Sequence, residues 1–462
     1  MFRFIDGEPI RSKVAITKAA GYEEAEKAVA EAIRLLGGPR AICKKGDVVM
    51  IKPNMVVTKH PDFAETTHPA VIAALVKVLK ETGAIIKVGE QACWQFNTEE
   101  AFKITGIGPA ALEAGADEIV DWEKDEYVDV EVPDPRSVEV AQFPKSVVDA
   151  DVFIHVPKMK TNYMYGNVTL GIKGLLGLLP GKDRGQYHRT IADMAWATSD
   201  LAKVIAPKHR LTLIDGITGM DGGGPHVGLI VKPGVIVASQ DMVAVEAVSC
   251  AIMGFHPLES PGTQCAMKAG LGTGELSEIE ILGKTIEEVQ YPFKRPLRRF
   301  VSKWKNVKEY IGGTCEGCLL AMSRSPFVVD PNKTYALISG TRAFVPKKIE
   351  ADEVWLIGTC AVREDHQFPH FMDKISHIKT IRKFPGCPGI IGFHDQYKRP
   401  LTKGTPYEIP DMLSIDGGAL AMLPDLIREE ALEDAIARHE GRMSLEETKK
   451  KFLSEGDTAH GS

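Results

Sequence analysis

Short apolar runs alternate with helical periodicity in the first half of the chain. Residues 47–53 and 84–89 are apolar runs of strand length, and residues 69–82 between them repeat apolar side chains at three- and four-residue spacing. That spacing places the apolar side chains on one face of a helix, and Gly83 follows as a helix-ending glycine. A strand, a helix and a strand in this order predict a βαβ unit of a parallel sheet.

The alternation continues, is interrupted by a basic segment, and then resumes. Further strands are predicted at residues 150–157, 211–216 and 235–239, with a helix through 244–248. Residues 291–311 are rich in Lys and Arg, and we interpret them as a basic linker helix. A second α/β unit follows, with strands at 335–340, 354–358 and 379–384 and a helix at 369–378. The predicted domains are residues 1–290, the linker 291–311, residues 312–400 and a helical C-terminal extension over residues 401–462.

Composition and charge exclude several classes of protein. The 462 residues are 44% hydrophobic and 26% charged, which is typical of globular proteins and not of disordered chains. The net charge of −6 argues against a nucleic-acid partner, whose binding surface is basic. No run reaches the roughly 18 apolar residues that span a membrane, and the first residues lack the apolar core of a signal peptide. We therefore expect a cytoplasmic protein with neither a nucleic-acid nor a membrane partner.

Four of the eight cysteines occur in glycine-rich settings that favour a cofactor site. Cys315 and Cys318 form a C-x-x-C pair, while Cys360 and Cys387 each follow a predicted strand. Neighbouring parallel strands end on the same side of a sheet, so thiols just beyond those ends can converge. Four thiolates are the ligands of a [4Fe–4S] cluster, and the adjacent glycines allow close approach of the backbone. The spacing thus predicts one [4Fe–4S] cofactor.

Three other interpretations of these cysteines remain open. Structural zinc uses the same thiolates, although its usual pattern is two C-x-x-C pairs and here the second pair is split. A redox-active C-x-x-C pair would leave Cys360 and Cys387 as ordinary core residues. All four cysteines could also be buried core residues without a cofactor.

The cysteine pattern resembles a known iron–sulfur module. A C-x-x-C pair, a Gly-x-Cys after a strand and a Gly-Cys-Pro resemble, over residues 312–392, the proximal-cluster module of nickel–iron hydrogenase small subunits. The spacings are shorter here, and Gly389 replaces the usual second proline. The resemblance implies a flavodoxin-like fold that holds one [4Fe–4S] cluster. The expected fold class is thus α/β, with a parallel-sheet N-terminal domain and a smaller flavodoxin-like α/β cluster-binding domain.

Polar stretches of the N-terminal domain predict a site for an anionic small molecule. Lysine side chains and glycine-rich backbone at strand ends suit a carboxylate or a phosphate, and Lys52 and Lys158 could point into one cleft. The predicted ligand-binding residues are Lys52, Asn54, Lys158, Lys160, Thr161 and Gly224. The predicted catalytic residues are Lys173, His188 and Asp215, with His188 as a general acid or base. The alternatives are that each lysine pairs with a surface acid, that His188 is a capped surface residue and that Asp215 caps a turn.

The order of these motifs resembles a large prokaryotic family of domains of unknown function, sometimes present in iron–sulfur proteins. The resemblance covers about residues 10–260 and rests on Lys52-Pro53-Asn54, residues 156–161, residues 169–173, Asp215-Gly216 and Gly224-Pro225. Many members read Lys-Asn-Leu where this chain reads Lys173-Gly174-Leu175. The resemblance supports an iron–sulfur cluster and implies no particular reaction.

The leading hypothesis is an iron–sulfur redox enzyme that acts on an anionic small molecule bound between the domains. Lys52, Lys158, Lys160 and Lys173 would anchor the ligand, and His188 would move a proton. One alternative is a lyase or dehydratase in which a cluster iron acts as a Lewis acid. Another is an electron-transfer or assembly protein without substrate chemistry, whose basic segment docks an acidic partner. An electron-donor protein and a second copy of the chain, as a homo-oligomer, remain open as partners.

Overall fold

The computed structural model describes residues 12–384 and two short strands before them, β1 (Phe4–Ile5) and β2 (Glu8–Pro9). Within residues 12–384 the gaps are 94–95, 163–164, 166, 182, 188–190, 223, 226–227, 296–305, 312–329, 341–342, 344, 364–366 and 368–369. His188, Cys315, Cys318, Cys387 and the predicted C-terminal extension lie outside the described residues. The chain divides into two compact units. Unit 1 contains the described residues of 1–184 and 194–295, and unit 2 contains those of 185–193 and 306–384.

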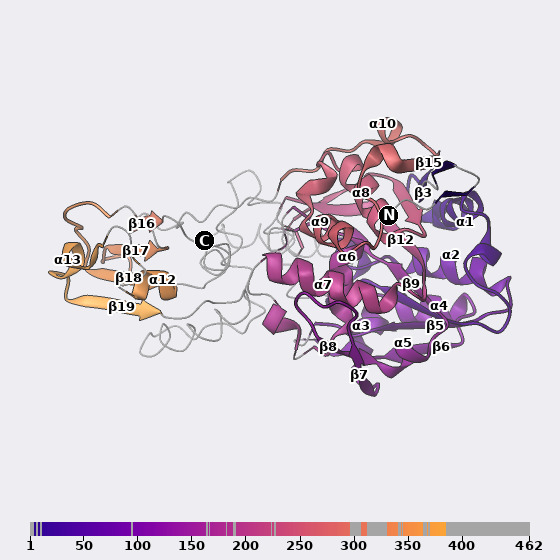
Figure 1. The fold of residues 1–462 in the computed structure, drawn as a ribbon, viewed down its shortest axis with the longest axis horizontal. Coiled ribbons are helices and arrows are strands. Elements are labelled where there is room, and N and C mark those ends of the chain that lie inside the picture. Colours follow the sequence, from indigo (N-terminus) through magenta and orange to yellow (C-terminus); the bar gives the residue numbers. More distant parts are fainter. Residues whose placement is uncertain are drawn as a thin grey trace, which may run out of the picture. The chain divides into compact units, whose positions relative to one another are not determined.

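Unit 1 is built on an eleven-stranded mixed sheet (Figure 1). Eight strands follow the order β15-β3-β14-β12-β9-β4-β5-β6; β10 and β13 pair with β12, and β11 pairs with β10. The bounds are β3 (Ser12–Lys18), β4 (Val48–Pro53), β5 (Ile85–Glu90), β6 (Glu118–Asp121), β9 (Val152–Val156), β10 (Lys158–Thr161), β11 (Val168–Thr169), β12 (His209–Asp221), β13 (Leu229–Val231), β14 (Val235–Ser239) and β15 (Ile279–Gly283). A separate hairpin joins β7 (Tyr127–Glu131) to β8 (Val140–Pro144).

Along the eight-stranded path of the sheet, β14 runs against the direction shared by the other seven strands. Strands β12, β9, β4, β5 and β6 run parallel, as the sequence predicted. Strand β14 is antiparallel to both of its neighbours, β12 and β3, which the apolar pattern did not reveal. A buried strand reads as a continuous apolar run in either direction, so the pattern alone does not give the direction of the chain.

Helices cover both faces of this sheet. The described helices of unit 1 are α1 (Ala25–Leu35), α2 (Pro69–Lys80), α3 (Thr98–Ile104), α4 (Ile107–Glu113), α5 (Lys145–Asp149), α6 (Gly171–Gly174), α7 (Ile191–Ile205), α8 (Met242–Ile252), α9 (Pro261–Lys268) and α10 (Ile286–Val289). Ala15 of β3 belongs to the core under α1 and α2, whereas its neighbours Val14 and Ile16 belong to the core under α8. Because adjacent strand residues point to opposite faces, this alternation shows that the sheet lies between two helical layers.

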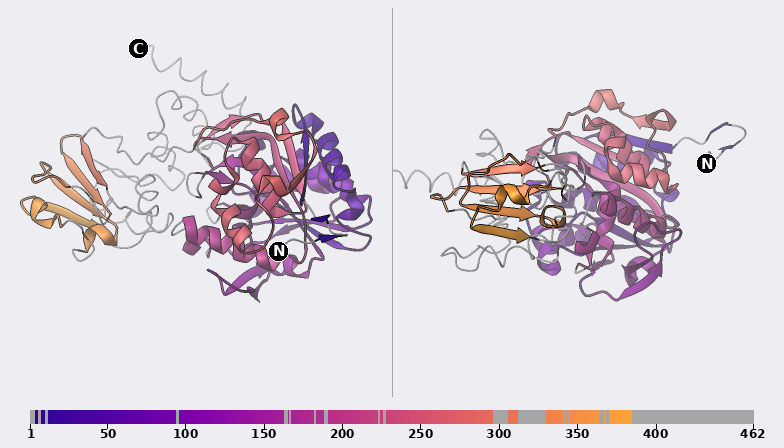
Figure 2. Two further views of the ribbon diagram at one scale, coloured as in Figure 1. Left: turned by 45° about the horizontal axis from the view of Figure 1, so that its top comes forward. Right: turned by 60° about the vertical axis from the view of Figure 1, so that its left-hand side comes forward.

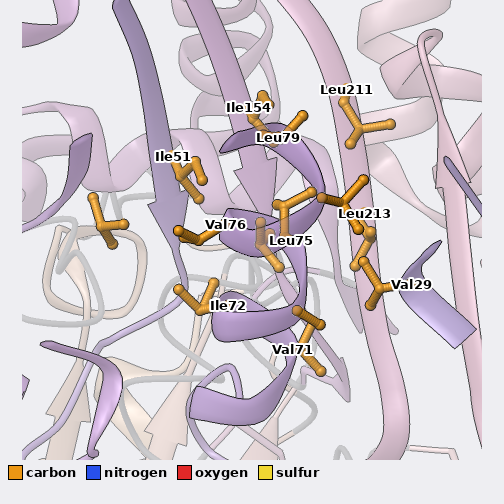
Figure 3. Packing of buried hydrophobic residues seen from close by; sticks show 14 of the residues in the cluster. Val29, Ile51, Val71, Ile72, Leu75, Val76, Leu79, Ile154, Leu211 and Leu213 are labelled. Carbon is orange, nitrogen blue, oxygen red and sulfur yellow. The ribbon is translucent and has the colours of Figure 1, made fainter. Parts of the chain in front are cut away.

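The helix predicted over residues 69–82 is α2, and it forms much of the first core. Val71, Leu75 and Leu79 of α2 pack with Ile51 of β4 and Ile154 of β9 (Figure 3). The helix begins where its sequence favours a start. Its first residue is a proline, and the imidazole Nδ1 of the preceding histidine accepts a hydrogen bond from the Ala70 amide at 3.1 Å.

Unit 2 is a smaller parallel α/β sheet, whose strands lie side by side in both views of Figure 2. Its strands β16 (Val307–Ile311), β17 (Tyr335–Ser339), β18 (Glu353–Ile357) and β19 (Thr380–Phe384) pair in sequential order, and the short helices α12 (Thr359–Val362) and α13 (Met372–Ile375) follow β18. The α/β class of both units is confirmed. The reversal of strand order that defines a flavodoxin-like sheet does not occur among these four strands.

The predicted basic linker helix over residues 291–311 was wrong where the structure describes it. Residues 291–295 contain no helix, and Val307–Ile311 is strand β16, which pairs in parallel with β17. The lysines dominated the sequence interpretation, but this stretch also holds β-branched and aromatic residues, which favour a strand once a partner strand is available. The helix predicted over residues 369–378 is likewise shorter, because α13 spans only Met372–Ile375. Among the described residues, no helix combines the length and apolar character needed to cross a membrane.

Candidate functional site

Lys52 and Glu90 form a buried ion pair where β4 and β5 end. Nζ of Lys52 donates to Oε2 of Glu90 at 2.5 Å and to the Pro53 carbonyl oxygen at 3.3 Å. Both side chains are almost fully buried. Burial lowers the pKa of Lys52 and raises the pKa of Glu90, because a low-polarity environment disfavours both charges. Lys52 therefore already has an acidic partner, and a ligand would compete with Glu90 for it.

Lys158 and Asp215 form a second, fully buried ion pair. Strand pairing places them opposite each other, Lys158 at the start of β10 and Asp215 inside β12. Nζ of Lys158 donates to Oδ2 of Asp215 at 3.0 Å, and the same Oδ2 accepts the backbone N–H of His68 at 2.9 Å. Burial lowers the pKa of Lys158, and the Asp215 carboxylate opposes that shift. This predicted ligand-binding lysine is thus internally neutralised.

Tyr22, His68 and Thr218 complete the network around Lys158, although none of them is among the predicted site residues. Nζ of Lys158 donates to the Tyr22 hydroxyl at 2.5 Å and to Oγ1 of Thr218 at 3.0 Å. The rings of Tyr22 and His68 are stacked with centroids 3.4 Å apart. Burial lowers the pKa of His68 to about 4. Tyr22 and Lys158 are 136 positions apart in sequence, so no local motif could have linked them.

Lys160 is buried within electrostatic reach of Lys158. Its Nζ donates to the backbone carbonyl oxygen of Glu65 at 2.6 Å, while the Glu65 carboxylate is ion-paired with Lys59. Among the described residues Lys160 makes no ion pair. Burial lowers its pKa to about 7; the charge of Glu65 opposes this, and Lys173, Lys158 and Lys59 strengthen it.

Lys173 is the accessible member of this group. Lys52, Lys158 and Lys160 are at most 2% exposed, whereas Lys173 on helix α6 is partly exposed. Within the described part of the chain it has neither a hydrogen bond nor an ion pair. Burial lowers its pKa to about 8; Cys93 and Glu90 oppose the shift, and Arg184 and Lys52 strengthen it. These electrostatic interactions connect the four lysines, which we call the lysine cluster: Lys52, Lys158, Lys160 and Lys173.

Arg184 fixes the segment that carries Lys173. Its guanidinium donates to the carbonyl oxygens of Gly177 and Leu179, each at 2.8 Å, and to the side-chain oxygen of Gln91 at 3.1 Å. These bonds hold the turn η4 (Leu175–Leu178), which follows α6, against the loop after β5. Arg184 is therefore engaged with the protein's own oxygens rather than free for a ligand.

The remaining predicted binding residues of unit 1, Asn54, Thr161 and Gly224, make contacts that hold neighbouring segments of the chain together. The backbone N–H of Asn54 donates to Oγ1 of Thr67 at 2.8 Å. Thr161 is fully buried, and its hydroxyl donates to the Met220 carbonyl oxygen at 3.3 Å. A side chain at Gly224 would lie 2.2 Å from the Thr161 carbonyl oxygen, so glycine is required for that close approach. The ligand-binding roles proposed for these residues stay predictions, as does the role of His188.

Of the four predicted cluster ligands, the structure describes Cys360 alone. It lies in α12, three residues after the end of β18. Among the described residues, no group of three or more His, Cys, Asp or Glu side chains could hold a metal ion. The cysteine site as a whole stays a prediction, because the other three thiols lie outside the described part.

Comparison with known proteins places the lysine cluster inside a family match. Residues 49–251 match a domain of unknown function, DUF362. This confirms the resemblance to a domain-of-unknown-function family over a shorter range than predicted. All four lysines of the cluster lie in the DUF362 region. The family description names neither a reaction nor a cofactor.

Individual relatives of the chain are distant. The thylakoid-associated protein sll1697 of Synechocystis sp. (strain ATCC 27184 / PCC 6803 / Kazusa) is 28% identical over 274 residues, which cover 58% of this chain and 79% of that protein. The lactate racemase apoprotein of Thermoanaerobacterium thermosaccharolyticum is 13% identical, with a TM-score of 0.33, over 72% of this chain and 69% of that chain. A protein of Thermotoga maritima is 12% identical, with a TM-score of 0.32, over 70% and 72%. At these TM-scores neither structure supports an argument about function.

Proposed function

We propose that the DUF362 region binds a small anionic molecule at the lysine cluster, and that the chain is an iron–sulfur redox enzyme acting on this ligand. The first part rests on one observation. Lys160 and Lys173 lie within electrostatic reach of each other and make no ion pair among the described residues. The two other lysines of the cluster each have their own carboxylate. The available positive charge is therefore concentrated on Lys160 and Lys173.

An anion at this position would offset the cost of keeping two ammonium groups together in a buried environment. Without one, burial and the nearby cations make protonation less favourable, which is why the pKa values of Lys160 and Lys173 fall to about 7 and about 8. A carboxylate, phosphate or similar group would favour protonation of both. Charge-assisted hydrogen bonds of this kind contribute roughly 1.5–3 kcal/mol each.

The iron–sulfur part of the proposal is supported by the strand register of unit 2. Strands β18 and β19 are parallel, and their last residues, Ile357 and Phe384, pair with each other. Cys360 and Cys387 each follow that paired position by three residues in the sequence. Cys315 and Cys318 follow β16, a further parallel strand of the same sheet. A [4Fe–4S] cluster held by the four would supply single-electron transfer to the ligand's reaction. The cytoplasmic location stays a prediction.

Sulfate binding measured by calorimetry tests the anion site. Sulfate keeps its charge from pH 6 to 9, so changes in affinity report on the protein. We expect wild-type protein to bind one sulfate per chain, and Lys160→Met and Lys173→Met each to weaken binding about tenfold or more, the loss of one charge-assisted bond. Lys77→Met, which removes an exposed lysine on α2, is the matched control and should bind as wild type. Equal affinity in all three variants would disprove the site, with circular dichroism confirming that each variant is folded.

The affinity for sulfate should also fall as the pH rises. The lysines bind the anion as ammonium ions, and their pKa values of about 7 and about 8 mean that both lose protons between pH 6 and pH 9. We therefore expect tight sulfate binding at pH 6 and little at pH 9. Bound sulfate should raise the pH at which the two lysines lose their protons. Lys173→Met should flatten the profile above pH 7. Cys93→Ser removes the thiol that opposes the fall in the Lys173 pKa, so it should move the profile to lower pH.

A further inference from the structure

Lys173 has the features of a reactive amine. It is the partly exposed member of the lysine cluster, and no described side chain or backbone oxygen accepts a hydrogen bond from its Nζ. A lysine that serves only as a structural cation is held by an acceptor, as Lys52 is by Glu90 and Lys158 by Asp215. The amine of Lys173 is thus partly exposed and has no hydrogen-bond acceptor among the residues that the structure describes.

The backbone beneath Lys173 is fixed in place. The N–H of Ile172, the residue before it, donates to the buried carboxylate of Glu246 at 2.7 Å, and the same carboxylate accepts from the Ser260 hydroxyl at 2.7 Å. On the other side, a side-chain carbon at Gly174 would lie 2.3 Å from the imidazole of His155, so glycine lets the helix pack directly on that ring. The anchored helix presents Lys173 in a defined position.

Burial and the cations around Lys173 lower its pKa, so more of the side chain is neutral amine near neutral pH than in an ordinary exposed lysine. Lys52 and Arg184 are its positive neighbours, and Lys160 interacts with it from β10. Adjacent cations and partial burial both make a lysine amine available as a nucleophile at neutral pH, as in enzymes that form Schiff bases. The same cations can hold a carboxylate next to the amine.

We propose that Lys173 forms an imine with the carbonyl carbon of a small 2-oxo acid whose carboxylate is bound by the lysine cluster. This inference rests on the proposed anion site and names its ligand class. The Nζ lone pair forms a bond to the carbonyl carbon while the C=O π electrons move to the oxygen, which takes up a proton. The resulting carbinolamine loses its hydroxyl as water and its nitrogen proton to solvent. The balance is one amine and one carbonyl compound to one imine and one water, with no oxidant or reductant.

A 2-oxo acid fits the arrangement because its two functional groups are adjacent. The carboxylate supplies the counter-charge that Lys160 does not have among the described residues, and the neighbouring carbonyl would then lie next to the amine of Lys173. Holding the reacting groups together in this way replaces a bimolecular encounter by an intramolecular step. A simple aldehyde without the acid group would lack that advantage.

Borohydride trapping with pyruvate tests the inference. Full-length protein is incubated with pyruvate, treated with sodium borohydride and digested, and the peptides are analysed by mass spectrometry. We expect a reduced pyruvate adduct on Lys173 in wild-type protein, with labelling of exposed lysines such as Lys77 at least tenfold lower. Acetaldehyde should label Lys173 far less than pyruvate does. Lys173→Arg keeps the positive charge but not the nucleophile, so it should bind pyruvate without forming an adduct.

Calorimetry with pyruvate and sulfate on the same samples separates the two proposals. If pyruvate and sulfate compete for binding but no adduct forms on Lys173, the imine inference is wrong while the anion site stands. An adduct that appears on Lys160, or equally on all exposed lysines, likewise contradicts it. If neither sulfate nor pyruvate binds, the proposed anion site is wrong, and the inference that depends on it fails too.

Discussion

Lys158→Met is expected to destabilise unit 1 by roughly 3–5 kcal/mol, because it leaves the Asp215 carboxylate buried without its cation. The backbone N–H groups of His68 and Ile217 still donate to Asp215, at 2.9 Å and 3.3 Å, so we expect the lower end of that range. Hydrogen–deuterium exchange should show the loss as faster exchange in peptides from β9 and β12. Peptides from β17 and β18 provide the reference within the same molecule.

A double-mutant cycle separates this effect from simple loss of packing. Asp215→Asn alone should also destabilise unit 1, since it leaves the Lys158 ammonium without its carboxylate. In Lys158→Met/Asp215→Asn both charges are gone, and the combined loss should be smaller than the sum of the two single losses by about 1 kcal/mol or more. Strict additivity would show that the pair contributes through packing alone. The cycle also explains why Lys158 is a poor choice for testing ligand binding, since its substitution affects the fold.

The second large effect concerns iron. Protein purified without oxygen should contain about four iron and four sulfide per chain, the content of one [4Fe–4S] cluster. Electron paramagnetic resonance of the dithionite-reduced sample should show a cluster signal. Cys360→Ala should lose most of the iron, because the cluster would keep three of its four thiolates.

The matched control is Cys265→Ala, which removes a buried cysteine of α9 in unit 1. It should retain its iron. Zinc in place of iron would support the structural-zinc alternative and contradict the cluster. A full iron content in Cys360→Ala would remove Cys360 from the ligand set. Sulfate binding should be unchanged in both cysteine variants, since the anion site is formed by unit 1.

Much of the fold could be predicted because its strands and helices carry strong local patterns. Strand β14 was predicted with the bounds Val235–Ser239 that the structure has, and the start of α2 at Pro69 follows from its proline and apolar periodicity. The direction of the strands and the pairing of β16 with β17 could not be predicted, because both depend on residues far away in the sequence. The basic character of residues 291–311 therefore led to the wrong prediction of a helix. The partner strand that stabilises Val307–Ile311 begins only at Tyr335.

The candidate site shows the same division. The lysines were recognisable at strand ends, and the structure brings all four within electrostatic reach. Which of them are neutralised could not be read from the sequence, because Glu90 and Asp215 reach Lys52 and Lys158 through cross-strand register. The sequence does not distinguish the four lysines, whereas the structure shows ion pairs for Lys52 and Lys158 and, in the part of the chain that it describes, none for Lys160 and Lys173.

Gly177 has a consequence for how fast any molecule could reach the deepest part of the cluster. A side-chain carbon there would lie 2.9 Å from Nζ of Lys52 and 3.2 Å from the Glu90 carboxylate, so the η4 backbone itself seals that pair. Two hydrogen bonds from Arg184, to the carbonyl oxygens of Leu179 and Gly177, hold this turn in place. A ligand could contact Lys52 only after the η4 turn moves away. Its association rate would then be set by this conformational change rather than by diffusion.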